Sequence, residues 1–324
     1  MSRRPNAERT LSEPPSPETT TCPEVAVSGR TPGSMQPSRA PGLRPQSLPR
    51  GLYYDRHCIA DAEHDEILRW LATIHPIREQ RYAPNHPPPQ GQSQRWLLRP
   101  VYWLGNWQFA CLNYYHPPRG ILHRCVKAEP FPPVLARLVA KAERIARRLY
   151  SGPDMPAAWH LNTCLVNFYG SRLEGDRRID TARVGEHKDF EPGPVASLSL
   201  GERALFQFVS SSRIGERGAV AFQQWLDDGS LQIFGGERWK KHYFHRVQRV
   251  DRKGSAFDVH AENFVTRRVN FTFRYVPDEH IVPYADLPEA SAEDVRGYME
   301  QLAAHSAFFR GELEARRRAS SARA

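Results

Sequence analysis

The hydrophobic period of the chain changes near Pro156, and this change constrains the fold more than any other feature. Before it, apolar residues recur at helical spacing; after it, they alternate with polar residues, which is typical of half-buried strands. Glycines and charged turns separate the alternating runs, and many short strands of this kind favour a sandwich or a jelly roll. The expected strands are 161–169, 195–200, 204–209, 219–225, 230–234, 243–250, 257–264 and 267–275.

Two helical patterns precede these strands. Apolar residues at i, i+3, i+4 and i+7 predict a helix that begins at Asp61, a capping residue, and ends before His75. A second helix is expected after Pro132, with Leu149 on its apolar face. The sequence therefore predicts an α+β fold, in which helices flank a double-stranded β-helix, or jelly roll.

Composition divides the chain into four parts. Residues 1–50 hold ten prolines and few large apolar side chains, so we expect a disordered tail. A last helix should begin at Ser291 and continue past Phe309. The expected boundaries are 1–50 for the Pro-rich tail, 51–155 for an N-terminal extension with an aromatic lid, 156–280 for the jelly-roll core, and 281–324 for the C-terminal helix and basic tail.

The composition also excludes several classes of protein. Five scattered cysteines without a C-x-x-C pair exclude a cysteine zinc knuckle and argue against a disulfide framework. A bound metal would therefore be held by histidines and carboxylates. The apolar runs fall short of the ~20 residues of a membrane-spanning helix, and the first fifty residues lack a secretory h-region. We expect a cytoplasmic monomer that has no membrane partner.

A candidate metal site lies in the stretch His187-Lys188-Asp189. Residues i and i+2 of a strand project to the same face, so this histidine and this aspartate can hold one metal ion. Taken alone, the pattern is more typical of a solvent-exposed pair. A third ligand must come from elsewhere, and His242 and His245 are both candidates. Two histidines and one carboxylate are the ligands of non-haem Fe(II) oxygenases.

Two strands present polar side chains that suit a small dicarboxylate. Alternation places Arg268, Asn270 and Arg274 on one face of the last strand, and guanidinium groups bind carboxylates through two parallel hydrogen bonds. The strand 161–169 offers Asn167 and Tyr169 in the same way. For each strand alone, a polar face in contact with solvent is the alternative interpretation.

Taken in order, these segments resemble the AlkB-like 2-oxoglutarate/Fe(II) dioxygenases. The resemblance covers about residues 160–275, and its motifs are weak singly but specific as an ordered set. The matching segments are Asn167-Phe-Tyr169, His187-x-Asp189-x-Glu191, Ser197-Leu-Ser-Leu-Gly201, Phe206-Gln-Phe208, Leu226-Asp-Asp-Gly229, Trp239 through His245-Arg-Val, and Arg268-x-Asn270-x-Thr272-x-Arg274.

The resemblance implies a role for each residue. The Fe(II) ligands would be His187, Asp189 and His245, the last preferred to His242 because the family's histidine precedes a small-x-aliphatic step. Glu191 matches a position that meets the target base in members acting on nucleic acid. The segment 170–186 is longer than in compact members, and we expect a surface loop or a substrate clamp. The 2-oxoglutarate contacts would be Asn167, Tyr169, Arg268, Asn270 and Arg274.

The implied reaction is an oxidative N-demethylation. With Fe(II), 2-oxoglutarate and O2, the family hydroxylates an N-methyl group and releases formaldehyde, succinate and CO2. The implied partner is nucleic acid, either alkylated DNA or alkylated RNA. The run 237–253 holds seven Lys or Arg residues against two acidic ones, which suits phosphates, although a solvated strand pair explains it equally well.

Contacts with the substrate are expected from the aromatic-rich segment 96–115, where the family keeps its nucleotide-recognition lid. Trp103, Trp107, Tyr114 and Tyr115 are candidates for stacking on a flipped base, although aromatic residues at this density are also typical of a core. Two other functions stay open. One is a dioxygenase of the same family that acts on a protein side chain or a small molecule; the other is a non-catalytic jelly-roll binding module.

Overall fold

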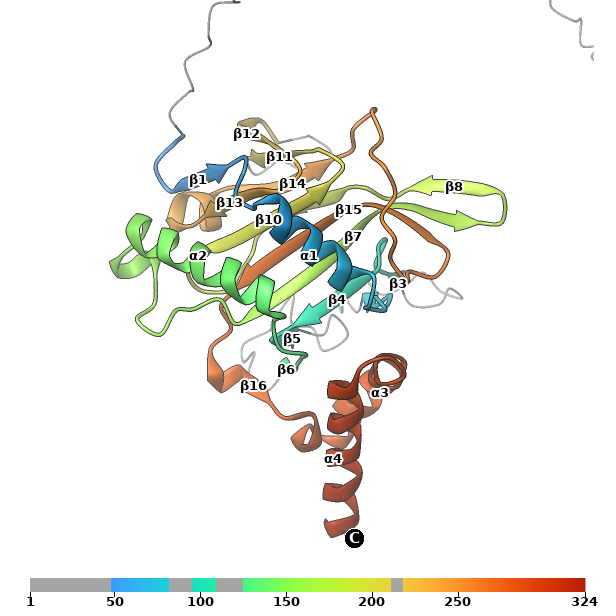
Figure 1. Cartoon of the computed structure of the whole chain (residues 1–324). Coiled ribbons are helices and arrows are strands. Elements are labelled where there is room, and N and C mark those ends of the chain that lie inside the picture. Colours follow the sequence, from blue (N-terminus) through green and yellow to red (C-terminus); the bar gives the residue numbers. More distant parts are fainter. Residues whose placement is uncertain (1–47, 82–94, 109–124, 211–217, 324) are drawn as a thin grey trace, which may run out of the picture. The chain divides into compact units, whose positions relative to one another are not determined.

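Two antiparallel sheets are built from the alternating segments of the sequence (Figure 1). The computed structural model describes residues 48–81, 95–108, 125–210 and 218–323. In the larger sheet, β15 lies between β10 and β7, and the hairpin strand β8 extends β7. Its strands, in spatial order, are β1 (Leu52–Asp55), β13 (Ser230–Phe234), β10 (Val195–Gly201), β15 (Phe264–Arg274), β7 (Thr163–Glu174) and β4 (Val101–Leu104), with β8 at Arg177–Asp180.

The smaller sheet carries the other half of the jelly roll. In spatial order, its strands are β12 (Val220–Leu226), β11 (Ala204–Val209), β14 (Phe244–Gln248) and β9 (Val184–His187). Two short additional sheets are formed by β16 (Ile281–Val282), β6 (Cys125–Lys127) and β5 (Asn106–Gln108), and by β2 (Gln80–Arg81) with β3 (Arg95–Trp96). The predicted α+β jelly roll with flanking helices is confirmed.

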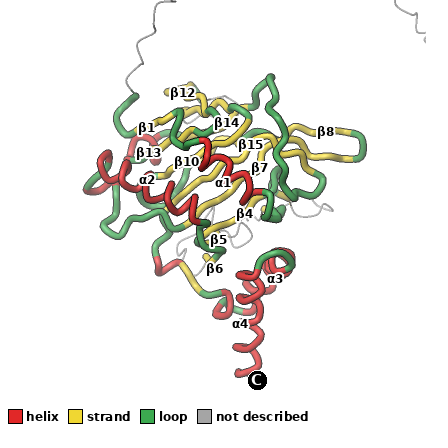
Figure 2. The backbone as a smooth tube through the Cα atoms, viewed as in Figure 1, coloured by secondary structure: helices red, strands yellow, loops and turns green. Residues whose placement is uncertain are grey.

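Helices α1 (Asp61–Leu71) and α2 (Pro133–Leu149) cover one face of the larger sheet, as the tube in Figure 2 also shows. Their apolar residues pack with alternate residues of β7 and β15, including Val166, Phe168 and Phe271, which are fully buried. Each such side chain contributes about 1.5–3 kcal/mol through burial. Because side chains alternate along a strand, the residues between them face the opposite side of the sheet.

Helices α1 and α2 differ from their predictions in three details, two at the ends of α1 and one on the apolar face of α2. Ala60 holds the capping position of α1, where its N–H donates to the Glu63 carboxylate (3.1 Å), and Asp61 is already the first helical residue. Helix α1 ends at Leu71, before the expected stop. Leu149 is 46% exposed, because the buried face of α2 ends at Ala146 and the last turn points to solvent.

The predicted C-terminal helix is two helices, α3 (Glu289–Ala303) and α4 (Ala307–Arg323). The chain turns at Ser306, whose N–H donates to the Leu302 carbonyl (2.9 Å). Its hydroxyl accepts the N–H of Phe309 (3.5 Å), a bond that begins the second helix as an N-cap does. This turn buries Phe309 against Tyr102 and Trp107, which a continuous helix would not do.

Two segments differ from their predicted structure. Residues 257–263 form no strand; Phe257 donates one backbone hydrogen bond to Thr266 (2.8 Å) and packs against the core cluster as a covering segment. The segment 170–186, expected as a loop or a clamp, contains the end of β7, the hairpin strand β8 and nearly all of β9. Charged residues conceal these strands in the sequence because their side chains point largely to solvent.

Residues 47–324 belong to one compact unit, and strand pairing crosses the boundary expected at residue 155, because β4 pairs with β7. Residues 1–47, which make up most of the expected tail, lie outside the described residues. None of the helices in the described ranges has the length and apolar character needed to span a membrane.

Candidate metal centre and cosubstrate pocket

Three of the predicted residues meet between strands β9 and β14. His187 is the last residue of β9 and lies opposite His245 of β14, and Asp189 follows two residues after the strand ends. One potential ligand atom from each of the three lies within 4.8 Å of the others. Pairing of two distant strands therefore produces a two-histidine, one-carboxylate group, the set that binds Fe(II) in non-haem oxygenases.

Contacts around the two histidines orient them for metal binding. The Nδ1 of His187 lies 2.9 Å from the carbonyl oxygen of Gly185, so this nitrogen carries the proton and Nε2 keeps its lone pair. His245 stacks on Phe206, with ring centroids 5.4 Å apart, and its Nε2 lies 3.4 Å from Oδ2 of Asp189. That carboxylate oxygen is buried and has no hydrogen-bond partner among the described residues, as a metal ligand requires.

The electrostatics favour the ionisation states that bind a metal. Burial lowers the pKa of His187, and burial together with the neighbouring His187 lowers the pKa of His245 to about 3. Burial would raise the pKa of Asp189, but the charge of Arg274 and the two histidines together hold it well below its usual value. Near neutral pH the site therefore presents neutral imidazoles and an ionised carboxylate, which are the ligand forms.

Arg274 connects the metal site to Glu191. Its Nη2 and Nε lie 2.8 and 3.0 Å from Oδ1 of Asp189, and Nε lies 3.5 Å from Oε1 of Glu191. The Nε2 of Gln108 donates to the same glutamate oxygen (2.9 Å). Glu191 is thus buried and held by two side chains, and its predicted contact with a target base stays a prediction.

The structure distinguishes between the two candidate histidines. His242 ends a short π-helical turn, Arg238–His242, where its side chain is 65% exposed and lies 3.9 Å from Glu237. It therefore lies before β14 and outside the sheet that carries His245. The same turn directs Lys240 inward, where Nζ donates to the carbonyl oxygens of Glu191 and Gly193.

The predicted cosubstrate residues share one buried surface on β7 and β15. Arg268 pairs with Tyr169 across the two strands, and Asn270 pairs with Asn167. The Nδ2 of Asn270 donates to Ser197 Oγ (2.8 Å), which fixes the orientation of its amide. All five predicted residues, Asn167, Tyr169, Arg268, Asn270 and Arg274, are at most 5% exposed.

Arg268 tests whether this surface fits a carboxylate ligand. Its Nη2 donates to Ser199 Oγ (3.0 Å), and its guanidinium lies 4.7 Å from the centre of the Tyr169 ring. Its Nε and Nη1 are buried without a hydrogen-bond partner among the described residues, where no carboxylate forms an ion pair with it. A buried cation of this kind is costly unless an anion pairs with it, so the surface fits a carboxylate of 2-oxoglutarate.

Sequence reasoning missed Arg99 and the inward position of Lys240. Arg99 lies just before β4 and is half-buried; its Nε donates to Oδ1 of Asn167 (2.7 Å), and its guanidinium lies 5.1 Å from the centre of the Tyr169 ring. Only strand pairing between β4 and β7 brings Arg99 to these residues. No local motif could have identified it.

The aromatic lid was predicted incorrectly for two of its four residues. Trp103 and Trp107 are 1% and 0% exposed, and Nε1 of each donates to Oε1 of Glu79 (2.6 Å). Both belong to the hydrophobic core, where Trp107 packs against Phe309 of α4, so neither presents a ring for stacking on a base. Tyr114 and Tyr115 lie outside the described residues.

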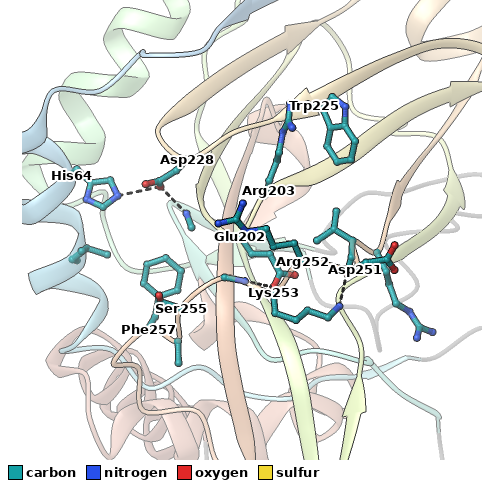
Figure 3. Close-up of a pocket in the computed structure, with 16 residues that line it drawn as sticks. His64, Glu202, Arg203, Trp225, Asp228, Asp251, Arg252, Lys253, Ser255 and Phe257 are labelled. Atoms are coloured by element: carbon teal, nitrogen blue, oxygen red, sulfur yellow. Dashed lines mark hydrogen bonds and ion pairs between the residues drawn. The ribbon is translucent and has the colours of Figure 1, made fainter. Parts of the chain in front are cut away.

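The basic residues of the run 237–253 lie in different parts of the structure. Arg246 lies 2.7 Å from Glu186 and 2.9 Å from Oε1 of Gln207. Residues 249–257 line a cavity of about 910 Å³, shown in Figure 3 together with Trp225 and the turn after β10. The metal triad does not line this cavity, so it is a separate feature from the site described above. The run is therefore not one continuous phosphate-binding surface.

Comparisons with known proteins agree with this site. Residues 51–274 match the model of the 2OG-Fe(II) oxygenase superfamily. A search of curated protein sequences finds no match to the chain.

Similar solved structures include OsALKBH1 (19% identity, 71% of this chain and 100% of that chain, TM-score 0.42). They also include SnoN, a non-heme alpha-ketoglutarate-dependent epimerase from nogalamycin biosynthesis (12% identity, 74% and 86%, TM-score 0.35). A third is the ribosomal oxygenase YcfD from Escherichia coli with cobalt and 2-oxoglutarate (10% identity, 78% and 63%, TM-score 0.30).

The family match covers well over half of the chain and agrees with the triad, so the interpretation as a non-catalytic binding module was wrong. The protein is an oxidoreductase that requires Fe(II), 2-oxoglutarate and O2. By its family model and its fold, this chain belongs to the 2OG-Fe(II) oxygenase superfamily.

Proposed function

We propose that this protein is an AlkB-like dioxygenase that removes N-methyl groups from alkylated bases in nucleic acid. The observation that carries the proposal is the excess of positive charge beside the metal triad. Arg99, Lys240, Arg268 and Arg274 supply four cationic side chains, and Asp189 and Glu191 supply two carboxylates.

This excess persists after the cofactors bind. A divalent metal adds two positive charges and 2-oxoglutarate adds two negative ones, so the two contributions cancel. The nearby Glu202 offsets the charge of Arg268 only in part, because it forms its ion pair with Arg267 (2.8 Å). A site that stays cationic in this state attracts an anionic substrate, and nucleic acid carries one negative charge per phosphate.

Each residue then has a proposed task. His187, Asp189 and His245 hold the metal ion, and Arg274 keeps the aspartate ionised and directed toward it. Bound Fe(II) would couple the oxidative decarboxylation of 2-oxoglutarate by O2, which yields succinate and CO2, to hydroxylation of the N-methyl carbon, which then leaves as formaldehyde. Asn167, Tyr169, Arg268, Asn270 and Arg274 orient the cosubstrate from the wall formed by β7 and β15. Glu191 lies beside this wall, 3.5 Å from Nε of Arg274, and its proposed task is to contact the base.

A protein side chain or a small molecule is the second candidate substrate. The observation that favours it is the burial of Trp103 and Trp107, which removes two of the four aromatic residues expected to stack on a base. If the substrate is nucleic acid, residues other than Trp103 and Trp107 must stack on the base.

The test is release of formaldehyde and succinate from single-stranded oligonucleotides carrying 1-methyladenine or 3-methylcytosine. Protein loaded anaerobically with Fe(II) should release both in equal amounts, and His187→Ala should release neither. Succinate without formaldehyde would retain the oxygenase and move the substrate to a protein or a small molecule. Release from unmodified oligonucleotides at the same rate would contradict the assignment of the methylated base.

A further inference from the structure

Arg99 contacts two predicted cosubstrate residues although it lies outside every motif that suggested them. It donates through Nε to Asn167 (2.7 Å) and lies over Tyr169 with its guanidinium carbon 5.1 Å from the ring centre. It reaches them from the segment before β4, at the edge of the larger sheet. Its position thus depends on the fold and not on the motif.

Arg99 and Arg268 approach the same ring. The guanidinium of Arg268 lies 4.7 Å from the centre of Tyr169, compared with 5.1 Å for Arg99. Across the described residues neither arginine forms an ion pair with a carboxylate. The two like charges oppose one another, and Arg99 contributes to lowering the pKa of Arg268 after the larger effect of burial.

An anion within reach of both guanidinium groups would offset this repulsion. The carboxylates of the site cannot supply it, because Asp189 and Glu191 are held by Arg274 at the metal end. A ligand must therefore bring the anion, and the ligand expected on this wall is a dicarboxylate. One carboxylate belongs at the metal end, so the other would lie at the end marked by Arg268 and Tyr169.

We propose that Arg99 is a cosubstrate-binding residue that holds the far carboxylate of 2-oxoglutarate together with Arg268. Within the described part of the chain Arg99 donates one hydrogen bond, from Nε to Asn167, so both of its Nη groups can donate to that carboxylate. Arg99 thereby closes the side of the pocket and selects a dicarboxylate over a monocarboxylate. The inference rests on the 2-oxoglutarate dependence of the protein and is independent of the substrate that is oxidised.

Binding experiments with two ligands test this role without any turnover. The affinity of the Mn(II)-loaded protein is measured by calorimetry for 2-oxoglutarate and for 2-oxopentanoate, which has the same carbon chain but lacks the far carboxylate. Arg99→Gln should weaken binding of 2-oxoglutarate about tenfold to hundredfold and leave binding of 2-oxopentanoate unchanged. Arg99→Lys keeps the charge but loses the planar guanidinium, so its affinity for 2-oxoglutarate should lie between those of the wild type and Arg99→Gln.

The matched control is Arg69→Gln, which replaces an exposed arginine on α1 and should change neither affinity. Equal weakening of both ligands in Arg99→Gln would indicate a general structural role and overturn the proposal. So would an unchanged 2-oxoglutarate affinity combined with weaker binding of a methylated oligonucleotide, which would assign Arg99 to a substrate phosphate. Absence of 2-oxoglutarate binding in the wild type would instead overturn the proposed function itself.

Discussion

The two ends of the cosubstrate wall differ in how their charges are balanced. At the metal end, Arg274 lies between Asp189 and Glu191, so opposite charges compensate one another within the protein. At the far end, Arg268 and Arg99 share one aromatic ring and have no carboxylate partner in the described part of the chain. The metal end is assembled before any ligand binds, whereas the far end becomes complete only with a bound anion.

The difference has a physical consequence for stability and for binding. A buried ion pair that loses one partner leaves an uncompensated charge, which is strongly destabilising. A buried cation that has no partner is already a cost to the folded protein, and removing it removes that cost. Residues of the same type on the same strand should therefore behave in opposite ways when they are replaced.

The largest expected effect comes from comparing Arg274→Gln with Arg268→Gln. The first variant leaves Asp189 and Glu191 without their cation and should lower the free energy of unfolding of the metal-free protein by about 3–5 kcal/mol. The second should leave the stability unchanged or raise it, while both should abolish 2-oxoglutarate binding. Urea unfolding of the two metal-free variants measures the difference. Equal destabilisation of the two variants would show that charges are balanced in the same way at the metal end and the far end of the cosubstrate wall.

Metal binding should stabilise the wild type and depend on the triad. Mn(II) at 100 times its dissociation constant should raise the free energy of unfolding by about 2.7 kcal/mol, because it binds only the folded protein. His187→Ala should lose this gain while keeping the apo stability close to that of the wild type, since His187 is only half-buried. Thermal unfolding with and without Mn(II) measures both quantities. A full gain in the variant would contradict the ligand assignment.

The metal affinity should change little with pH, because the histidine ligands are neutral before the metal arrives. An imidazole with the ordinary pKa of about 6.5 is mostly protonated at pH 5.5 and must lose that proton to bind a metal. Burial lowers the pKa of His245 to about 3, so this ligand is neutral at pH 5.5, and burial also lowers the pKa of His187, which moves proton competition at that ligand to lower pH. Calorimetry with Mn(II) at pH 7.5 and 5.5 should therefore give dissociation constants within about threefold of each other. A loss greater than tenfold would contradict the shifted pKa values.

A smaller effect is expected at Ser199, whose hydroxyl accepts from Nη2 of Arg268 (3.0 Å). Ser199→Ala removes one polar side-chain contact of this guanidinium and should weaken 2-oxoglutarate binding by about three- to tenfold, because Arg268 becomes less well oriented. The conservative Ser199→Thr, which keeps the hydroxyl, should restore part of the affinity. Calorimetric titration of both variants measures the effect; an Ala variant equal to the wild type would show that the ring of Tyr169 is enough to hold Arg268.

Much of the fold was predictable because alternation is a local signal. The limits of β11 and β13 match their predictions, and the wall residues of β15 were placed on one face by counting every second residue. The hairpin formed by β8 escaped prediction because its exposed arginines hide the alternation. The segment 257–263 was misread for the opposite reason, since its partly buried apolar residues alternate although it pairs with no strand over its length.

Spacing along the chain determined the jelly-roll class, the pairing of His187 with Asp189 and the polar face that carries Arg268, Asn270 and Arg274. These features depend on which residues lie two positions apart, and a strand fixes that geometry by itself. The family resemblance already favoured His245 over His242, and the tertiary structure places His245 beside the other two ligands. Only the tertiary structure decided that Trp103 and Trp107 are core and that Arg99 reaches Tyr169. Those outcomes depend on pairing between β9 and β14 and between β4 and β7. Contacts between residues so distant along the chain produce no periodic pattern in the sequence.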